Sequence, residues 1–194
     1  MSLNPNKARE MLGAVSRTET RNDTGETAVA LLNFLLRQLE ELRDLANGYP
    51  RNPIAGDVWF SGKALAELCD ELTVVLADCR LPEQEELASR LAVGMALQVM
   101  GHYPEEVFPR VLRNARCREA LGQLKEAITG YESIVGDYVQ MGLAELLEDE
   151  QLDASSRMIL ESVSYAATRL GEFDPERADA LVSLNSAVAE ALES

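Results

Sequence analysis

Two groups of carboxylates are the residues whose type and spacing best suit chemistry. Glu40, Glu41 and Asp44 lie close together on one predicted helix, and Glu67 and Asp70 stand three residues apart on the next. Clustered carboxylate oxygens bind Mg²⁺, and the bound ion polarises phosphate and activates water. These acids therefore predict, as one hypothesis, a magnesium site that serves phosphate hydrolysis.

The segment 39–76 that carries these acids resembles the all-α nucleoside triphosphate pyrophosphohydrolases. That family places E-E-x-x-E on one helix and E-x-x-D on the next, where the carboxylates hold magnesium on the triphosphate. Glu40, Glu41 and Asp44 match the first motif, with Asp in place of its last Glu, and Glu67 and Asp70 match the second. The resemblance implies a Mg²⁺ cofactor and a nucleotide substrate.

Helix geometry offers an alternative explanation for the same acids. At about 100° per residue, the three acids of the first group lie opposite an apolar series on their own helix. That series is Ala28, Leu32, Leu35, Leu39, Leu42 and Ala46. Glu67 and Asp70 likewise face away from the leucines of their helix, and no clear basic group for a triphosphate lies nearby. A solvated outer face accounts for both sets.

Arg110, Arg113 and Arg116 form the second candidate site, spaced three residues apart on one predicted helix. Their spacing predicts one stripe that points away from the apolar face of this helix. Three guanidinium groups on such a stripe can bind a carboxylate or phosphate of an acidic peptide. The alternative is that they pair with neighbouring acids of this chain, at positions 83, 85 and 86.

The charge balance bears on the class of partner. The 194 residues carry 33 Asp and Glu against 18 Lys and Arg, a net charge of −15. Such a surface repels phosphate backbones, so we expect no nucleic-acid partner. The first residues hold no apolar signal segment and no apolar run is long enough to cross a bilayer, which predicts a cytoplasmic protein without a membrane partner. Three cysteines without metal-ligand spacing, and one histidine, leave little for a zinc site.

Apolar residues recur at helical spacing along nearly the whole chain, which predicts an all-α fold of about seven helices. Residues 1–22 are expected to form a partly mobile N-terminal segment, and 23–194 a single helical domain. Seven expected helices span about 23–47, 61–79, 81–101, 104–121, 123–147 with a break near Gly136, 153–170 and 174–194, and a shorter helix over about 4–15 is expected to precede them. Trp59 and Phe60 fall in the predicted loop 48–61, where they either close the end of a core or form an exposed anchor for a partner.

Three helix joints share one pattern: "MGHYPEE" at 100–106, "LGQLKEA" at 121–127 and "LGEFDPE" at 170–176. Through them, residues 88–136 resemble tetratricopeptide repeats, with Ala115 and Ala127 at the small positions and Tyr131 at the aromatic one. The resemblance implies antiparallel helical hairpins that bind peptides. Gly101 and Gly122 are 21 residues apart, and Gly171 follows 49 residues later, rather than at the family's period of about 34 residues, so an unrelated helical bundle stays open.

The sequence thus predicts an array of antiparallel helical hairpins that acts as a non-catalytic protein–protein interaction module. The expected partner is a protein or peptide, acidic if the arginine stripe binds it, and self-association stays open. In this hypothesis the protein needs no cofactor. The alternative from a different class is the Mg²⁺-dependent pyrophosphohydrolase.

Overall fold

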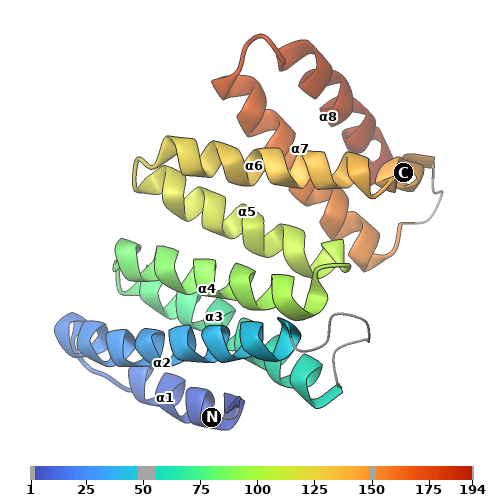
Figure 1. The fold of residues 1–194 in the computed structure, drawn as a ribbon. Helices are drawn as coiled ribbons and strands as arrows, with labels where there is room; N and C mark the ends of the chain where they lie inside the picture. The colour runs from blue at the N-terminus through green and yellow to red at the C-terminus, as the bar shows by residue number, and fades with distance from the viewer. Residues whose placement is uncertain (1–2, 48–55, 149–151, 194) are drawn as a thin grey trace. The chain divides into compact units, whose positions relative to one another are not determined.

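The computed structural model describes residues 3–47, 56–148 and 152–193, and all regular structure in these ranges is helical (Figure 1). It contains eight α-helices and one 3₁₀ helix, η1, where about seven helices were expected. The described chain forms two compact units, 1–103 and 104–194. Within each unit consecutive helices fold back on each other, which confirms the predicted all-α hairpin architecture; the predicted domain limits stay a prediction.

The first unit contains α1 (Pro5–Val15), α2 (Arg21–Asn47), α3 (Gly56–Asp78) and α4 (Pro82–Met100). α3 and α4 form a hairpin, α4 also packs on α2, and α1 lies against α2 and α3. The apolar series of α2 faces inward, with Leu35 and Leu42 completely buried. Two glycines allow close approach: a Cβ on Gly62 would lie 2.7 Å from Val99 Cγ1, and one on Gly94 would lie 2.9 Å from Leu39 Cδ2. The unit is therefore held by close contacts between backbone and leucine or valine side chains.

The ends of these helices follow local chemistry. The side chain of Asn4 accepts a hydrogen bond from the N–H of Lys7 and caps α1. α2 begins at Arg21, two residues before the expected start at 23. The Thr20 hydroxyl accepts from the Asp23 N–H at 3.2 Å and donates to its carboxylate at 2.7 Å. α3 ends at Asp78, and Arg80 in the turn that follows has a φ of 55°, in the left-handed region.

The start of α3 corrects one expectation. Trp59 and Phe60 were expected in a loop over 48–61, but both lie in the first turns of α3, which begins at Gly56. Their rings meet edge to face at 5.1 Å, and Phe60 is 69% exposed. Residues 48–55 of that expected loop lie outside the described residues.

The second unit contains α5 (Pro104–Ala120), α6 (Leu124–Gln140), η1 (Leu143–Glu148), α7 (Ala154–Phe173) and α8 (Ala178–Glu193). α5 and α6 form one hairpin, α7 and α8 a second, and α7 packs on both α5 and α6 (Figure 1). A Cβ on Gly130 would lie 3.0 Å from the Cβ of Ala115, so α6 passes very close to α5 there. Ala115 is one of the two small positions that the repeat resemblance assigned, whereas Gly130 is not, and the resemblance stays a prediction.

The three joints of the shared motif are not equivalent. Gly122 has φ +75°, and the hydrogen bonds from Gly122 N to Glu119 O and from Gln123 N to Arg118 O complete a Schellman motif. Gly101 instead ends α4 in the right-handed region with φ −60°, and Gly171 lies inside α7. Only the 121–127 joint therefore ends its helix on a left-handed glycine.

Two more boundaries differ from the expected ones. α6 continues through Gly136, where a break was expected, and ends next to Gly142 with φ +67°. α7 extends to Phe173 and α8 starts only at Ala178, so Asp174 follows α7 instead of capping α8. Asp153 does cap α7 as expected, accepting from the N–H of Ser156 at 2.7 Å.

Candidate functional site

The acids of the proposed magnesium site lie on outer helix faces of the first unit. Glu40, Glu41 and Asp44 line a shallow depression on α2, beside Arg37 and Leu45. Glu67 and Asp70 lie on α3 and take no part in that depression. Within the described ranges, no three His, Cys, Asp or Glu side chains are grouped so that they could hold a metal ion.

The three arginines of α5 do not share one exposed stripe. Arg110 is only 9% exposed, and its Nη1 donates to the backbone oxygen of Glu106 at 2.6 Å and to the Glu106 carboxylate at 2.9 Å. Arg113 and Arg116 are exposed, and the guanidinium of Arg116 lies 5.2 Å from the ring centre of Tyr165. The expectation that all three arginines lie on one exposed stripe is therefore wrong for Arg110.

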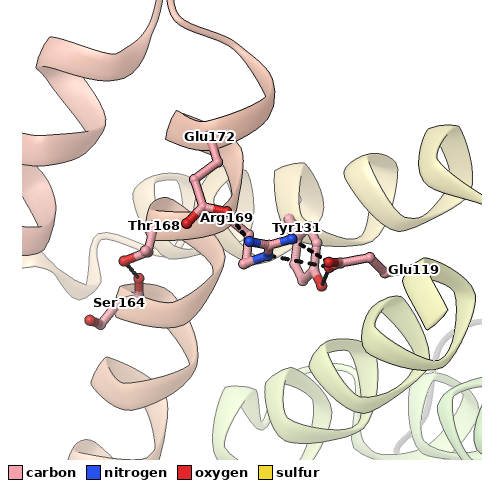
Figure 2. A network of polar contacts seen from close by, with 6 residues as sticks. All are labelled: Glu119, Tyr131, Ser164, Thr168, Arg169 and Glu172. Carbon is pink, nitrogen blue, oxygen red and sulfur yellow. Dashed lines mark hydrogen bonds and ion pairs between the residues drawn. The ribbon is translucent and has the colours of Figure 1, made fainter.

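A partly buried polar network joins three helices of the second unit (Figure 2). The hydroxyl of Tyr131, on α6, donates to Oε2 of Glu119, on α5, at 2.7 Å. Arg169, on α7, donates to the same oxygen from Nε at 3.3 Å and contacts the other Glu119 oxygen and Glu172 with its two terminal nitrogens. Tyr131 is completely buried, while the Glu119 and Arg169 side chains are each 24% exposed.

The network fixes the charges of its members. Burial alone would raise the pKa of the Glu119 carboxyl, but hydrogen bonds from Arg169 and Tyr131 outweigh burial and hold that pKa below its usual value. Burial, and then the hydrogen bond to Glu119, raise the pKa of the Tyr131 hydroxyl, so this hydroxyl stays a proton donor. The hydrogen bond to Glu119 likewise raises the pKa of Arg169. A charged carboxylate with these donors satisfied is suited to joining helices rather than to transferring protons.

A groove of about 750 Å³ lies in the second unit between α6, the end of α7 and the start of α8. Its lining is mostly apolar, with charged residues among it. The lining consists of Ile128, Glu132, Val135, Gly136, Leu170, Phe173, Asp174, Glu176, Arg177, Ala180 and Leu181. Gly136 leaves room in this lining, because a Cβ added there would meet no atom within 4 Å.

One arginine connects the two sides of the groove. Arg177, just before α8, binds the Glu132 carboxylate on α6 at 3.1 Å and the Asp174 carboxylate at 3.2 Å. Its side chain is 65% exposed and that of Glu132 is 46% exposed, so both pairs are accessible to water. Such exposed ion pairs contribute little stability, about 0–1 kcal/mol each.

The sequence predictions did not include this groove, although α6 carries a signal for it. One face of α6 is buried through Ala127, Tyr131, Ile134 and Tyr138. A second set on the same helix, Ile128, Glu132, Val135 and Gly136, has the same helical spacing and lines the groove. The two faces of α6 therefore have different roles: one packs in the core of the second unit, and the other lines the groove.

The functional proposal rests on the geometry of these surfaces and not on similarity to a known protein. Comparison of the chain with protein-family models, with curated proteins and with solved structures finds no match in any of the three. None of the described helices is long and apolar enough to span a membrane.

Proposed function

We propose that this protein is a non-catalytic interaction module whose second unit binds a segment of a partner protein in the groove between α6 and α8. The observation that carries the proposal is the groove itself, which is lined by both apolar and charged side chains. Its volume of about 750 Å³ falls in the range of known ligand sites. Grooves between helices commonly take an amphipathic segment whose apolar side chains anchor it.

The helical-hairpin scaffold supports this proposal. The α5–α6 hairpin packs Gly130 on Ala115 and ends α5 with a left-handed Gly122, which is how a short-linked hairpin keeps its helices close. The partly buried network of Glu119, Tyr131 and Arg169 connects α7 to that hairpin. Side-chain hydrogen bonds therefore hold together α6 and α7, two of the helices that line the groove. A preformed groove reduces the entropy that binding must overcome.

The magnesium hypothesis receives no comparable support. Among the residues that the structure describes, its carboxylates form no group that could hold a metal ion. The arginines of α5 give less support than the groove, because Arg110 is bound to Glu106 of its own helix. We therefore base the proposed function on the groove.

Selection of random peptides on the full-length protein tests the proposal. Binders are synthesised, and their dissociation constants are measured for wild type, Gly136→Phe and Gly171→Phe. Gly136→Phe adds a ring where a Cβ meets open space inside the groove, whereas Gly171→Phe adds the same ring on α7 outside that lining.

We expect Gly136→Phe to weaken binding at least about tenfold, as truncation or occlusion of an anchor does. Gly171→Phe should bind like wild type. Circular dichroism spectra equal to that of wild type show that both variants fold. Selected peptides that bind Gly136→Phe as tightly as wild type, or the absence of any binder, would refute the proposal.

A further inference from the structure

We propose that the groove selects a basic partner segment, and that Arg177 holds the place of the partner's cation between Glu132 and Asp174. This inference rests on the proposed function and names the chemistry of its ligand. It differs from the expectation of an acidic partner, which the arginines of α5 had suggested.

The charges at the groove are unbalanced. Three carboxylates, Glu132, Asp174 and Glu176, line it against the single cation Arg177. Residues 104–194 as a whole carry 18 Asp and Glu against eight Lys and Arg. A segment with Lys or Arg beside its apolar anchors is therefore attracted to this groove, while an acidic segment is repelled.

Arg177 occupies the position that such a cation would take. Its Nη1 lies 3.1 Å from Oε1 of Glu132, and its Nε lies 3.2 Å from Oδ2 of Asp174. The two carboxylates come from different elements, α6 and the turn after α7, and one guanidinium contacts both because it carries several N–H donors. An arginine of a partner can make the same two contacts.

Displacing the Arg177 side chain from these two carboxylates costs little free energy. Both ion pairs are exposed, and exposed pairs are weak because water solvates each charge well. Arg177 is also held on the short turn between α7 and α8, where its backbone N–H bonds Asp174 O at 3.2 Å, so the turn persists when the side chain swings away. Because Arg177 competes with the incoming cation for the same carboxylates, it lowers the affinity of the groove for a basic segment.

Two synthetic peptides test this inference. One is an 18-residue amphipathic peptide of Leu, Ala and Arg, and the other has Glu in place of every Arg. Dissociation constants are measured by fluorescence anisotropy on the full-length protein at low and high salt. The variants are Arg177→Ala, Glu132→Gln and Asp174→Asn, with Glu126→Gln on α6 as a control that removes one exposed acid outside the groove.

We expect the Arg peptide to bind and the Glu peptide to bind at least about tenfold more weakly. Arg177→Ala should tighten binding of the Arg peptide about three- to tenfold, because the internal competitor is gone. Glu132→Gln and Asp174→Asn should each weaken it by a similar factor, while Glu126→Gln leaves it unchanged. Asp174→Asn keeps the side-chain oxygen that accepts the Glu176 N–H at 3.1 Å, so the turn is preserved.

The outcomes separate this inference from the proposed function. If Gly136→Phe abolishes binding of the Arg peptide but Arg177→Ala, Glu132→Gln and Asp174→Asn do not change it, the groove binds and the cation exchange is refuted. If Glu126→Gln weakens binding as much as Glu132→Gln, the attraction comes from overall charge, which also refutes it. Binding that Gly136→Phe leaves intact overturns both.

Discussion

Replacing Tyr131 with Phe removes one hydroxyl from the centre of the second unit and keeps the ring. Tyr131 is completely buried and donates to the Glu119 carboxylate at 2.7 Å. A hydrogen bond to a charged group contributes about 1.5–3 kcal/mol to stability. The Glu119 side chain is 24% exposed and keeps its contacts with Arg169, so water and Arg169 compensate in part. We therefore expect the low end of the range, a loss of about 1.5 kcal/mol.

Urea unfolding followed by circular dichroism measures this loss. With a denaturant slope of about 2 kcal/mol per molar urea, the midpoint should fall by about 0.7 M. Tyr165→Phe is the matched control, because Tyr165 is 36% exposed on the neighbouring helix, and this change should stay within about 0.5 kcal/mol. An unchanged midpoint for Tyr131→Phe, or an equal loss for Tyr165→Phe, would refute the view that the hydroxyl helps to join the helices.

Three further changes test other parts of the structure. Because the pKa of Glu119 is lowered in the fold, its charge contributes stability above the usual pKa of 4.5 that is lost as the pH falls through the folded value. The difference in unfolding free energy between wild type and Glu119→Gln should therefore shrink between pH 7 and about pH 3, and urea titrations that show a constant difference would contradict it. Arg80→Gly relieves a left-handed arginine with φ 55° and should raise the free energy of unfolding by about 0.5–1 kcal/mol, seen as a higher thermal midpoint; a lower midpoint counts against this strain. Gly62→Ala places a Cβ 2.7 Å from Val99 Cγ1 and should lower stability by about 1–3 kcal/mol in urea, whereas wild-type stability would show that α3 and α4 are not packed this closely.

The helices were predictable because their signals are local. A 3.6-residue apolar period predicted helices along nearly the whole chain, and Asp153 caps α7 at the expected start of that helix. The Asn185 side chain on α8 accepts a hydrogen bond from the Ser164 hydroxyl on α7. These features depend on residues close in sequence or on one helix face.

The errors came from residues whose effect depends on their surroundings. Glycine was expected to break a helix at Gly136, but a glycine with right-handed torsion angles only weakens a helix, and α6 ends beside the left-handed Gly142 instead. Trp59 and Phe60 were assigned to a loop because glycine and proline precede them, yet α3 had already begun at Gly56. Helix periodicity cannot say where the first turn starts.

The candidate site was less predictable than the fold. Arg110 carries the same spacing as Arg113 and Arg116, but it is buried against Glu106, and spacing alone does not reveal burial. The groove requires α6 to lie opposite the start of α8, and the ion pair of Glu132 with Arg177 joins residues 45 positions apart. Pairing of distant helices depends on how whole faces fit together, which a single sequence does not specify.

Methyl-group NMR of the full-length protein, titrated with the Arg peptide, tests the central claim most directly. If the peptide binds in the groove, the methyl signals of Ile128, Val135 and Leu181 should shift on its addition, because these side chains line the groove. The methyl signals of Val74, an exposed residue of the first unit, should not move. Shifts at Val74 with none at Ile128 and Val135 would place binding elsewhere and contradict the proposed function.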